Sequence, residues 1–442
     1  MTSIRPMFSV FLLCTTVLPA FSQSWATYDQ TNSPLPSDRI QSIFVDPGGV
    51  KWFGTEAGLV RFHDGFWSVF QTTEDKQTLA SDNIRDIDYE VTDSGPELWL
   101  ATDNGVSVAG IEVDGLTVAT PYRTDNTGLL SNSVRSVDVD AEHRRWFGTD
   151  DGVSMFDGNT NEWGSFAESV PDYPVTDIGI DNSGGWRYCC TRGGGVGRLK
   201  VEVDGITSAS VYDEDWSGLM SDNVNTVYVY ENGDQWFGTD AAASFHDTTL
   251  TKELWQVYFE YNGLADNRIS VITVDDRDRV WFGTPAGASV FDWSEFTTYT
   301  TADGLAGNNI LDIAVDTDGS MWFGTDRGAT CFSESGEPDT TAPEIPHGLT
   351  LRGNYPNPFT ETTTLEFTLS DDAHVTVRIT DTLGRIVRCL ILENRSDRVQ
   401  DVIWDGDTDS GIRAASGMYI MRIRAVGSGF AFEQSHKVVL LN

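Results

Sequence analysis

A four-residue segment recurs along most of this chain and constrains its fold more than any other feature. It is Trp52-Phe53-Gly54-Thr55, and near copies begin at Trp99, Trp146, Trp236, Trp281 and Trp322, while Trp186-Arg187-Tyr188-Cys189 stands where one more copy is due. Successive tryptophans lie 47, 47, 40, 50, 45 and 41 residues apart. This period matches a four-stranded propeller blade and is too long for a leucine-rich or ankyrin unit. The sequence therefore predicts seven blades.

Each repeat also carries the pattern of an antiparallel sheet. A largely alternating apolar segment such as Asn309 to Val315 precedes the tryptophan and predicts a strand. After a turn rich in Asp and Gly come the tryptophan segment, a Gly-x-x-x-Phe segment such as Gly152 to Phe156, and a fourth strand with aromatic residues. One such sheet cannot bury both faces, whereas seven packed radially can. We therefore expect an all-β fold with a seven-bladed β-propeller over residues 23–333.

The two ends of the repeat region are incomplete in complementary ways. Trp25-Ala26-Thr27-Tyr28 copies a fourth strand before any first strand has occurred, and the seventh repeat stops at Phe332 without a fourth strand. A strand at residues 25–28 that completes the seventh blade would remove two exposed sheet edges. We expect the ring to close in this way.

Residues 1–22 predict a cleaved secretory signal. They carry Arg5, an apolar run from Met7 to Ala20, and a small residue at Ser22, after which we expect cleavage. The apolar run is too short to span a bilayer. No later segment is apolar enough to cross a membrane, so we expect no transmembrane segment and an exported, monomeric chain.

The composition is strongly acidic, with 67 Asp and Glu against 29 Lys and Arg and a net charge of −38. This balance excludes nucleic acid as a partner. The acidic residues are spread over every repeat, which favours a solvated surface suited to high salt, as in halophilic proteins. A local cluster that binds a cation is the alternative.

Four cysteines remain after the signal, and their spacing is not that of a disulfide framework. They are Cys189, Cys190, Cys331 and Cys389. We expect the adjacent pair, Cys189 and Cys190, to be small buried residues on a strand. A vicinal disulfide or a soft-metal site is the alternative.

The segment after the propeller predicts a linker and a second domain. Residues 334–348 are rich in Pro, Thr and Gly, and residues 349–442 contain short strands that predict a small β-sandwich. Asp405, Asp407 and Asp409 alternate as in a calcium loop, but the glycine and the distal glutamate of that loop are missing. We expect a structural turn there.

No catalytic group can be assembled from the sequence. The six histidines are scattered, and we expect His63 and His246 in turns. No nucleophile, zinc or phosphate-loop motif occurs. We predict no catalytic residue, metal or cofactor.

Two resemblances carry further expectations. Leu130 to Val134 and Trp146 to Val153 resemble the two-component-regulator propeller repeat, which covers residues 24–333. In that family the propeller is the extracytoplasmic sensor of hybrid histidine kinases and often recognises polysaccharide fragments. This chain has no kinase segment, so the resemblance implies only a binding role.

Asn354 to Phe359, Trp404-Asp405-Gly406 and Ser416 to Tyr419 resemble the C-terminal sorting domain of type IX secretion, although its usual final lysine is absent. That domain has an immunoglobulin-like fold related to flagellar hook-capping proteins. The resemblance implies passage through the periplasm, the type IX machinery as a partner, and release or display at the outer cell surface.

Departures from the repeat point to a ligand site. Turns that lead into the innermost strand and turns after the tryptophan strand emerge on one face, where propellers usually hold ligands. The shared acids Asp150, Asp240 and Asp326 are expected to accept backbone hydrogen bonds in their turns. The candidate ligand-binding residues are Arg39, Tyr173, Arg192, Trp216, Tyr261, Arg268 and Arg327.

Guanidinium groups suit an anionic or hydroxyl-rich ligand, and exposed aromatic rings can stack on sugars. The alternative is that the arginines pair with neighbouring acids. The function that we predict is a secreted, non-enzymatic propeller that binds a ligand such as a poly- or oligosaccharide. A carbohydrate-active lyase or hydrolase and a structural surface protein are the other readings.

Overall fold

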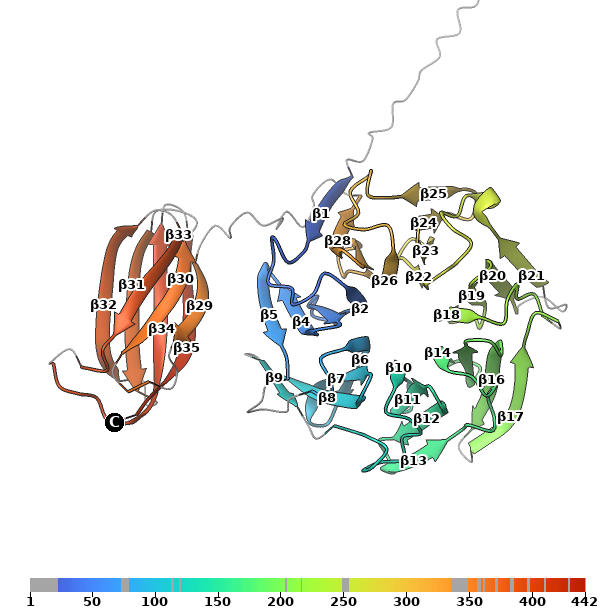
Figure 1. Cartoon of the computed structure of the whole chain (residues 1–442), viewed down its shortest axis with the longest axis horizontal. Coiled ribbons are helices and arrows are strands. Elements are labelled where there is room, and N and C mark those ends of the chain that lie inside the picture. The colour runs from blue at the N-terminus through green and yellow to red at the C-terminus, as the bar shows by residue number, and fades with distance from the viewer. Residues whose placement is uncertain are drawn as a thin grey trace, which may run out of the picture. The chain divides into compact units, whose positions relative to one another are not determined.

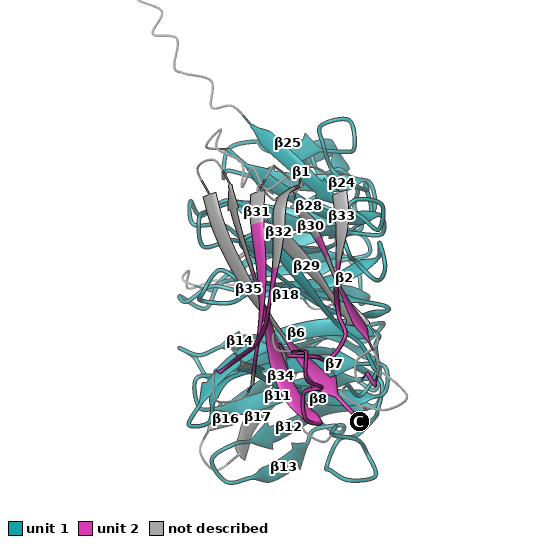
Figure 2. Cartoon of the chain, turned by 90° about the vertical axis from the view of Figure 1, so that its left-hand side faces the viewer, with its two compact units in different colours: residues 1–340 teal, residues 341–442 magenta. Residues whose placement is uncertain are grey.

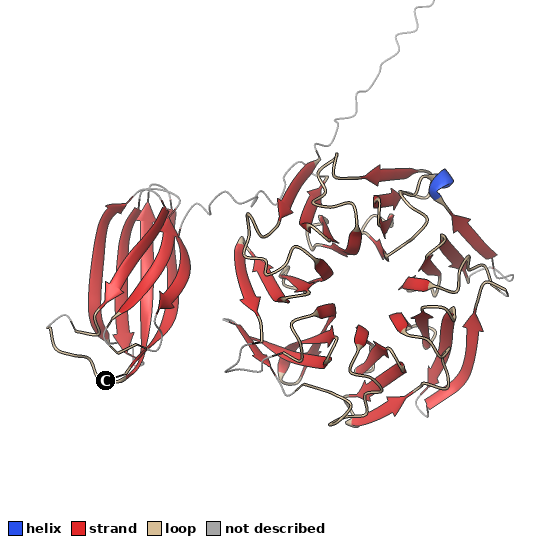
Figure 3. Ribbon diagram, viewed as in Figure 1, coloured by secondary structure: helices blue, strands red, loops and turns tan. Residues whose placement is uncertain are grey.

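The computed structural model divides the chain into two compact units, residues 1–340 and 341–442 (Figure 2). Strands make up nearly all of the described elements, and the one helix among them is the short 3-10 turn η1 (Glu260–Asn262) (Figure 3). The described residues are 23–72, 79–112, 115–118, 121–202, 205–215, 217–248, 254–334, 349–355, 359–360, 362–369, 373–381, 385–395, 398–408, 411–427 and 430–441. The signal at residues 1–22 and nearly all of the linker, residues 335–348, therefore lie outside the described residues.

The first unit is a ring of seven four-stranded antiparallel sheets (Figure 1), which confirms the predicted propeller. The inner strands are β2 (Ile40–Val45), β6 (Ile84–Thr92), β10 (Val134–Val139), β14 (Val175–Asp181), β18 (Val224–Val229), β22 (Val271–Val274) and β26 (Ile310–Val315). The second strands are β3 (Lys51–Thr55), β7 (Gly95–Thr102), β11 (Arg144–Thr149), β15 (Trp186–Thr191), β19 (Gln235–Thr239), β23 (Val280–Thr284) and β27 (Met321–Thr325).

The third strands are β4 (Gly58–His63), β8 (Gly105–Glu112), β12 (Gly152–Asp157), β16 (Val196–Glu202), β20 (Ala243–Asp247), β24 (Gly287–Phe291) and β28 (Gly328–Ser333). The outer strands are β5 (Phe66–Phe70), β9 (Gly115–Val118), β13 (Glu162–Ser165), β17 (Gly205–Tyr212), β21 (Leu254–Tyr258), β25 (Phe296–Tyr299) and, in the seventh blade, β1 (Ser24–Tyr28). We number the blades from β2.

The N-terminal strand β1 pairs antiparallel with β28, from Ser24 opposite Ser333 to Tyr28 opposite Ala329. Its aromatic side chains reach both neighbouring blades. The ring of Trp25 lies 5.4 Å from that of Tyr299 in the sixth blade, and the ring of Tyr28 lies 5.3 Å from that of Trp67 in the first. The first strand of the chain thus packs the ring closed across three blades.

The fourth blade follows the repeat in a different register from the one that its tryptophan suggests. Thr191 pairs with Val175 just as Thr55 pairs with Ile40, so Tyr188 occupies the position of Trp52. The expectation that Trp186 begins the fourth copy is therefore wrong by two residues. Register follows the hydrogen-bond ladder and the turn after it, and the Thr191 hydroxyl makes the same bond to the turn, to Gly195 O at 2.7 Å, as Thr55 makes to Gly58 O at 2.8 Å.

This register puts Cys189 and Cys190 at the positions of Phe53 and Gly54. Both are free, fully buried thiols, as the sequence predicted, and burial raises the pKa of Cys189 to about 12. The two sulfurs form no disulfide in this structure.

The glycine of the repeat lets adjacent blades approach closely. A Cβ on Gly54 would lie 2.9 Å from Cγ2 of Ile84, the first inner-strand residue of the next blade. Where the glycine is replaced by Ala101 or Cys190, the residue in the next blade is the smaller Val134 or Val224. These two seams thus pair a larger residue with a smaller one, which favours close packing, although the glycine Gly148 also faces a valine, Val175.

The second unit is a sandwich of two sheets. One has the order β29 (Leu349–Tyr355), β30 (Thr363–Leu369), β33 (Arg398–Trp404), and the other the order β32 (Ile386–Arg395), β31 (Ala373–Asp381), β34 (Gly417–Gly427), β35 (Phe430–Leu440). Their facing residues, among them Phe367, Val377, Trp404 and Met421, form one buried core. After Trp404 the chain turns, and Asp405 Oδ1 accepts the Asp407 amide at 3.0 Å, as expected of a structural turn; Asp409 lies outside the described residues.

Candidate functional site

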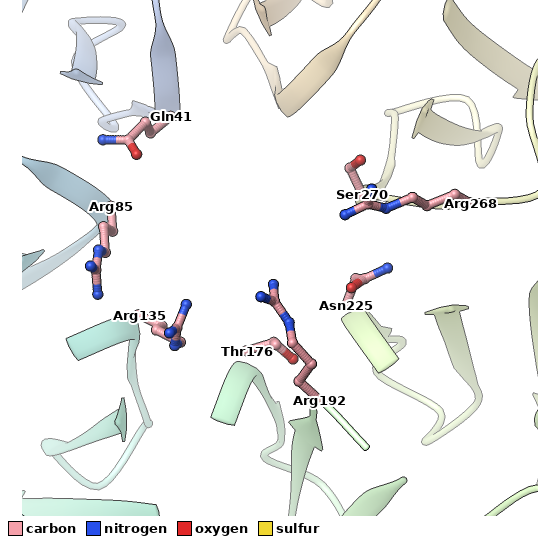
Figure 4. Close-up of a pocket in the computed structure, with 8 residues that line it drawn as sticks. All are labelled: Gln41, Arg85, Arg135, Thr176, Arg192, Asn225, Arg268 and Ser270. Atoms are coloured by element: carbon pink, nitrogen blue, oxygen red, sulfur yellow. The ribbon is translucent and has the colours of Figure 1, made fainter. Parts of the chain in front are cut away.

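The inner strands begin on the same face of the ring on which the tryptophan strands end, because Ile40 pairs with Thr55 and the other blades repeat this register. On this face a cavity of about 290 Å³ opens around the ring axis (Figure 4). We call it the mouth. Its lining residues are Gln41, Arg85, Arg135, Thr176, Arg192, Asn225, Arg268 and Ser270.

A backbone irregularity directs most of these side chains into the mouth. In six of the seven blades the register of the inner strand shifts after its first apolar residue, for example between Ile40 and Ser42 and between Ile84 and Asp86. A bulge of this kind re-aims a side chain. The bulged residues of five blades, Gln41, Arg85, Arg135, Thr176 and Asn225, all line the mouth.

Four of the bulged side chains tie one blade to the next. Each donates a hydrogen bond to the backbone carbonyl of the first apolar inner-strand residue of the following blade. The bonds are Gln41 Nε2 to Ile84 O at 2.9 Å, Arg85 Nη1 to Val134 O at 3.3 Å, Thr176 Oγ1 to Val224 O at 2.6 Å and Asn225 Nδ2 to Ile269 O at 2.9 Å. These four residues therefore hold the ring together, whatever else they contact.

The other three arginines do not make this bond. Arg135 Nε lies 2.6 Å from Asp150 Oδ1 in the same blade, and Arg268 Nε lies 3.3 Å from Asp240 Oδ1 in a largely exposed pair. Arg192 is exposed, and its backbone amide bonds to Pro174 O at 3.0 Å. No hydrogen bond or ion pair of the Arg192 guanidinium is recorded within the described part of the chain.

The electrostatics of the mouth are those of a crowded cationic site. Burial and the charge of Arg135 lower the pKa of Arg85 below its usual range. Burial alone would raise the pKa of Asp150, but hydrogen bonds from Ser133 and Arg135 and the charge of Arg135 outweigh it and lower that pKa. Arginine stays protonated throughout the accessible pH range, so the guanidiniums repel one another and attract anions.

The structure places two of the predicted site residues in the lining of the mouth and others outside it. Arg192 and Arg268 line the mouth. Tyr173 is half-exposed and is not among the lining residues; its ring lies over the turn at Gly193, which follows Arg192 in the sequence, where an added Cβ would lie 3.0 Å from Tyr173 Cδ1. Arg39 and Arg327 are on the same face but do not line the cavity. Tyr261 is 81% exposed on η1, where its ring stacks on that of Phe259 at 5.2 Å, away from the mouth lining. Trp216 lies outside the described residues.

Sequence reasoning missed Gln41, Arg85, Arg135, Thr176, Asn225 and Ser270. It placed the site at the residue before the first apolar residue of the inner strand, which lines the mouth only at Arg268, whereas in six blades the lining residue is the one after it. A signal was present. In the first five blades the first two apolar residues of the inner strand are three apart, as in Ile40 and Ile43 or Ile84 and Ile87, which breaks the period of two where the bulge lies.

Two further expectations are wrong. The carboxylate of Asp150 bonds to Arg135 and does not hold its turn, because the Thr149 hydroxyl already accepts the Asp151 amide at 3.2 Å and donates to Gly152 O. His246 is buried within β20, stacked on Trp255 at 4.4 Å and 2.7 Å from Gln235, so it is not a turn residue.

A layer of carboxylates follows the mouth, one residue further along three inner strands. Each accepts a backbone amide of the next blade. The bonds run to Asp86 from Val137 N at 2.9 Å, to Asp177 from Val227 N at 2.9 Å and to Asp312 from Ile43 N at 2.6 Å. Burial raises all three pKa values, to about 6 for Asp177 and Asp312 and well above the usual carboxyl range for Asp86.

The acids are not arranged as a metal site or as an evident catalytic pair. Among the described residues no group of three or more His, Cys, Asp or Glu side chains is placed to hold a metal ion. None of the eight residues that line the mouth is acidic, whereas a glycosidase needs two carboxyl groups about 5 to 10 Å apart in its pocket. The lining chemistry is that of hydrogen-bond donors.

Comparison with known proteins agrees with this architecture. Residues 263–286 and 304–327 match the family described as two component regulator propeller, and residues 356–429 match the FlgD Ig-like domain. The chain therefore carries regulator-type propeller repeats and an immunoglobulin-like domain, as predicted. The match names the immunoglobulin-like fold and not its sorting role, which stays a prediction. Among curated proteins none matches this chain.

Solved structures share the fold at low identity. The extracellular domain of the hybrid two component system BT3049 of B. thetaiotaomicron aligns with a TM-score of 0.57 at 18% identity, over 94% of this chain and 57% of that one. PorZ, a surface component of the type-IX secretion system of Porphyromonas gingivalis, aligns at 0.55 and 18%, over 92% and 60%. Streptogramin B lyase aligns at 0.53 and 14%, over 72% and 99%. This chain thus spans less than two thirds of the first two proteins, and identities this low show the fold alone.

The described residues hold no helix that could cross a membrane, since η1 has only three residues.

Proposed function

We propose that this chain is a recognition propeller that works outside the cell and binds a carbohydrate ligand at the mouth without chemistry of its own. The observation that carries the proposal is the mouth itself, where guanidinium, amide and hydroxyl groups from several blades converge on one cavity with no carboxylate in its lining. Such donors match the hydroxyl and acidic groups of sugars. The volume of the cavity is near the lower end for small-ligand sites and suits the end or a short stretch of a glycan.

The aromatic ring of Tyr173 supports the same reading. It lies over Gly193 and Gly194, which directly follow the lining residue Arg192, with about half of its surface exposed. A flat aromatic face next to polar groups fits a sugar ring, which has one apolar face and hydroxyl groups at its edge.

We also propose that the protein is released or displayed at the outer surface by type IX secretion through residues 349–442, after a signal at residues 1–22. The immunoglobulin-like match over residues 356–429 and the structural likeness to PorZ support this route. In a bacterium with type IX secretion, removal of residues 349–442 should leave the propeller in the periplasm. Equal export of the intact and truncated chains would reject the route.

The binding function is tested with the purified mature chain and a panel of polysaccharides. We expect saturable binding to at least one of them, by calorimetry or affinity electrophoresis, with no new reducing ends or unsaturated products. Product formation would instead establish the enzyme reading. Tyr173→Ala should weaken binding, whereas Tyr261→Ala, which removes a more exposed ring away from the mouth lining, should not. Equal effects of the two changes would move the site away from the mouth.

A further inference from the structure

The mouth has the opposite charge character from the rest of the protein. The chain carries a net charge of −38, yet four of the eight residues that line this cavity are arginines and none is acidic. Arg85, Arg135 and Arg192 belong to the second, third and fourth blades, and Arg268 lies on the loop before the inner strand of the sixth blade. The four arginines are therefore not one basic segment of the chain (Figure 4). We propose, on the basis of the function proposed above, that the mouth selects a ligand with anionic groups, namely a carbohydrate that carries carboxylate or sulfate.

The four arginines differ in how far their guanidinium groups are already engaged by other groups of the protein. Arg85 is committed to the seam between the second and third blades through Ser133 Oγ and Val134 O, and Arg135 is paired with Asp150. Arg268 has a long contact to Asp240, and Arg192 has no recorded guanidinium partner within the described residues. Arg192 and Arg268 are therefore the least engaged of the four guanidinium groups and the best placed to bind an oxyanion.

Figure 4 shows the Arg192 and Arg268 side chains extending into the cavity from different parts of the ring. A planar guanidinium donates two parallel hydrogen bonds to a carboxylate or a sulfate, which gives both affinity and orientation. Two such groups, one on the fourth blade and one on the loop before the sixth blade, can engage two acidic groups of a single ligand. The amide of Asn225 and the hydroxyls of Thr176 and Ser270 line the same cavity and can serve sugar hydroxyls.

The carboxylate layer that follows the mouth limits how deep an anion can go. Asp86, Asp177 and Asp312 lie one residue beyond the bulge, each fixed to a backbone amide of the next blade. Asp177 and Asp312, whose pKa values lie at about 6, are ionised at neutral pH and repel an anion that moves further along the ring axis. The anionic groups are therefore held at the level of the arginines, and the ligand binds at the mouth and does not thread through the ring.

The overall charge of the protein makes the test stringent. A protein with this net charge repels a polyanion as a whole, and more strongly at low salt. Saturable binding of a polyanion at low ionic strength therefore indicates a local cationic site. Dextran, carboxymethyl-dextran and dextran sulfate share one backbone and differ only in the acidic group, so their comparison isolates the charge and distinguishes carboxylate from sulfate.

The experiment measures the binding of these three polymers to the intact mature chain and to variants. We expect binding of one or both acidic polymers and at least tenfold weaker binding of neutral dextran. Arg192→Ala and Arg268→Ala should each weaken binding of the acidic polymer by about tenfold, the loss expected for one charged hydrogen-bonding partner. Arg39→Ala and Arg327→Ala remove the same charge from the same face outside the lining and serve as matched controls. Arg85 is left unchanged because it also holds the ring.

The outcomes separate this inference from the proposed function. Equal binding of neutral dextran and the acidic polymers, or binding of only neutral glycans in the wider panel, would overturn the anionic preference and leave carbohydrate recognition intact. Binding of the acidic polymers that is weakened equally by the mouth and control variants would also overturn it, because the attraction would then be diffuse. Failure to bind any glycan would reject both proposals.

Discussion

Asp177 gives this protein a pH dependence of stability that is opposite in sign to that of most carboxylates. Burial raises its pKa from 3.8 to about 6, against the hydrogen bonds that it accepts from Val227 and Ile178. Below pH 3.8 the carboxyl is protonated in both the folded and the unfolded state. As the pH rises through 6, the unfolded chain has already released the proton, and the folded chain must release it in a buried site. The stability that is present at low pH is therefore lost as pH rises through the folded pKa.

The size of the effect follows from the shift. One pKa unit corresponds to about 1.4 kcal/mol, so a shift of roughly two units removes about 3 kcal/mol between pH 3.8 and 6. Replacing Asp177 by Asn removes the titration. The free energy of unfolding of Asp177→Asn, relative to the native protein, should therefore rise by up to about 3 kcal/mol from pH 3.5 to pH 7. In Asp177→Asn the side-chain NH₂ faces one of the two backbone N–H groups that the carboxylate accepts. This lowers the free energy of unfolding of the variant, but by an amount that does not depend on pH.

The assay is urea unfolding of both proteins at a series of pH values, at constant high salt so that the many surface carboxylates are screened. Only the difference between the two proteins is interpreted, which cancels the titration of the other acids. Asp312→Asn, in the seam between the seventh and first blades, should behave alike because burial raises the pKa of Asp312 to about 6. Asp103→Asn is the control of opposite sign, since hydrogen bonds from Ser81 and Asn83 and the charge of Arg85 lower the pKa of Asp103 despite its partial burial. A difference for Asp177→Asn that stays flat from pH 3.5 to 7 would refute the reasoning.

Three further predictions concern the ring and its surface. Deletion of residues 23–30 should lower the free energy of unfolding by more than about 5 kcal/mol, because it removes buried Tyr28 and leaves β28 as an open edge. A melting temperature equal to that of the intact chain would show that β1 does not hold the ring. Gly54→Ala should lower the free energy of unfolding by about 1–3 kcal/mol, measured by chemical denaturation, because the added methyl group meets Ile84. Adding Ile84→Val to this variant should restore part of the loss. If Gly54→Ala alone leaves stability unchanged, the two blades do not approach this closely. The melting temperature should rise steeply between low and molar NaCl because self-repulsion is screened, and a flat profile would reject an adaptation of the acidic surface to salt.

The repeat of Trp52 to Thr55 was enough to predict the propeller, because each copy carries a complete strand pattern within about 45 residues and local periodicity determines strands. The matching deficits at Trp25 and Phe332 likewise pointed to the closing strand β1. Arg192 and Arg268 could be named in advance because they depart from the repeat in turns whose face the topology fixes.

The tertiary structure alone decided which side chains meet at the mouth and which of them are free to bind. The bulge turns Arg85 and Arg135 toward the ring axis, and no pattern within a single repeat shows whether such a side chain will bond to the next blade or to an acid of its own. The partner of Arg85 is a backbone carbonyl about 50 positions away in the next blade. The partner of Arg135 is Asp150, whose carboxylate is not needed in its own turn because Thr149 already accepts the backbone amide there. The fourth blade shows the same limit, because hydrogen-bond register placed Tyr188, and not the conspicuous Trp186, at the repeat position. Strand identity is a local property of the chain, whereas register and side-chain pairing depend on what the neighbouring blade offers across the seam.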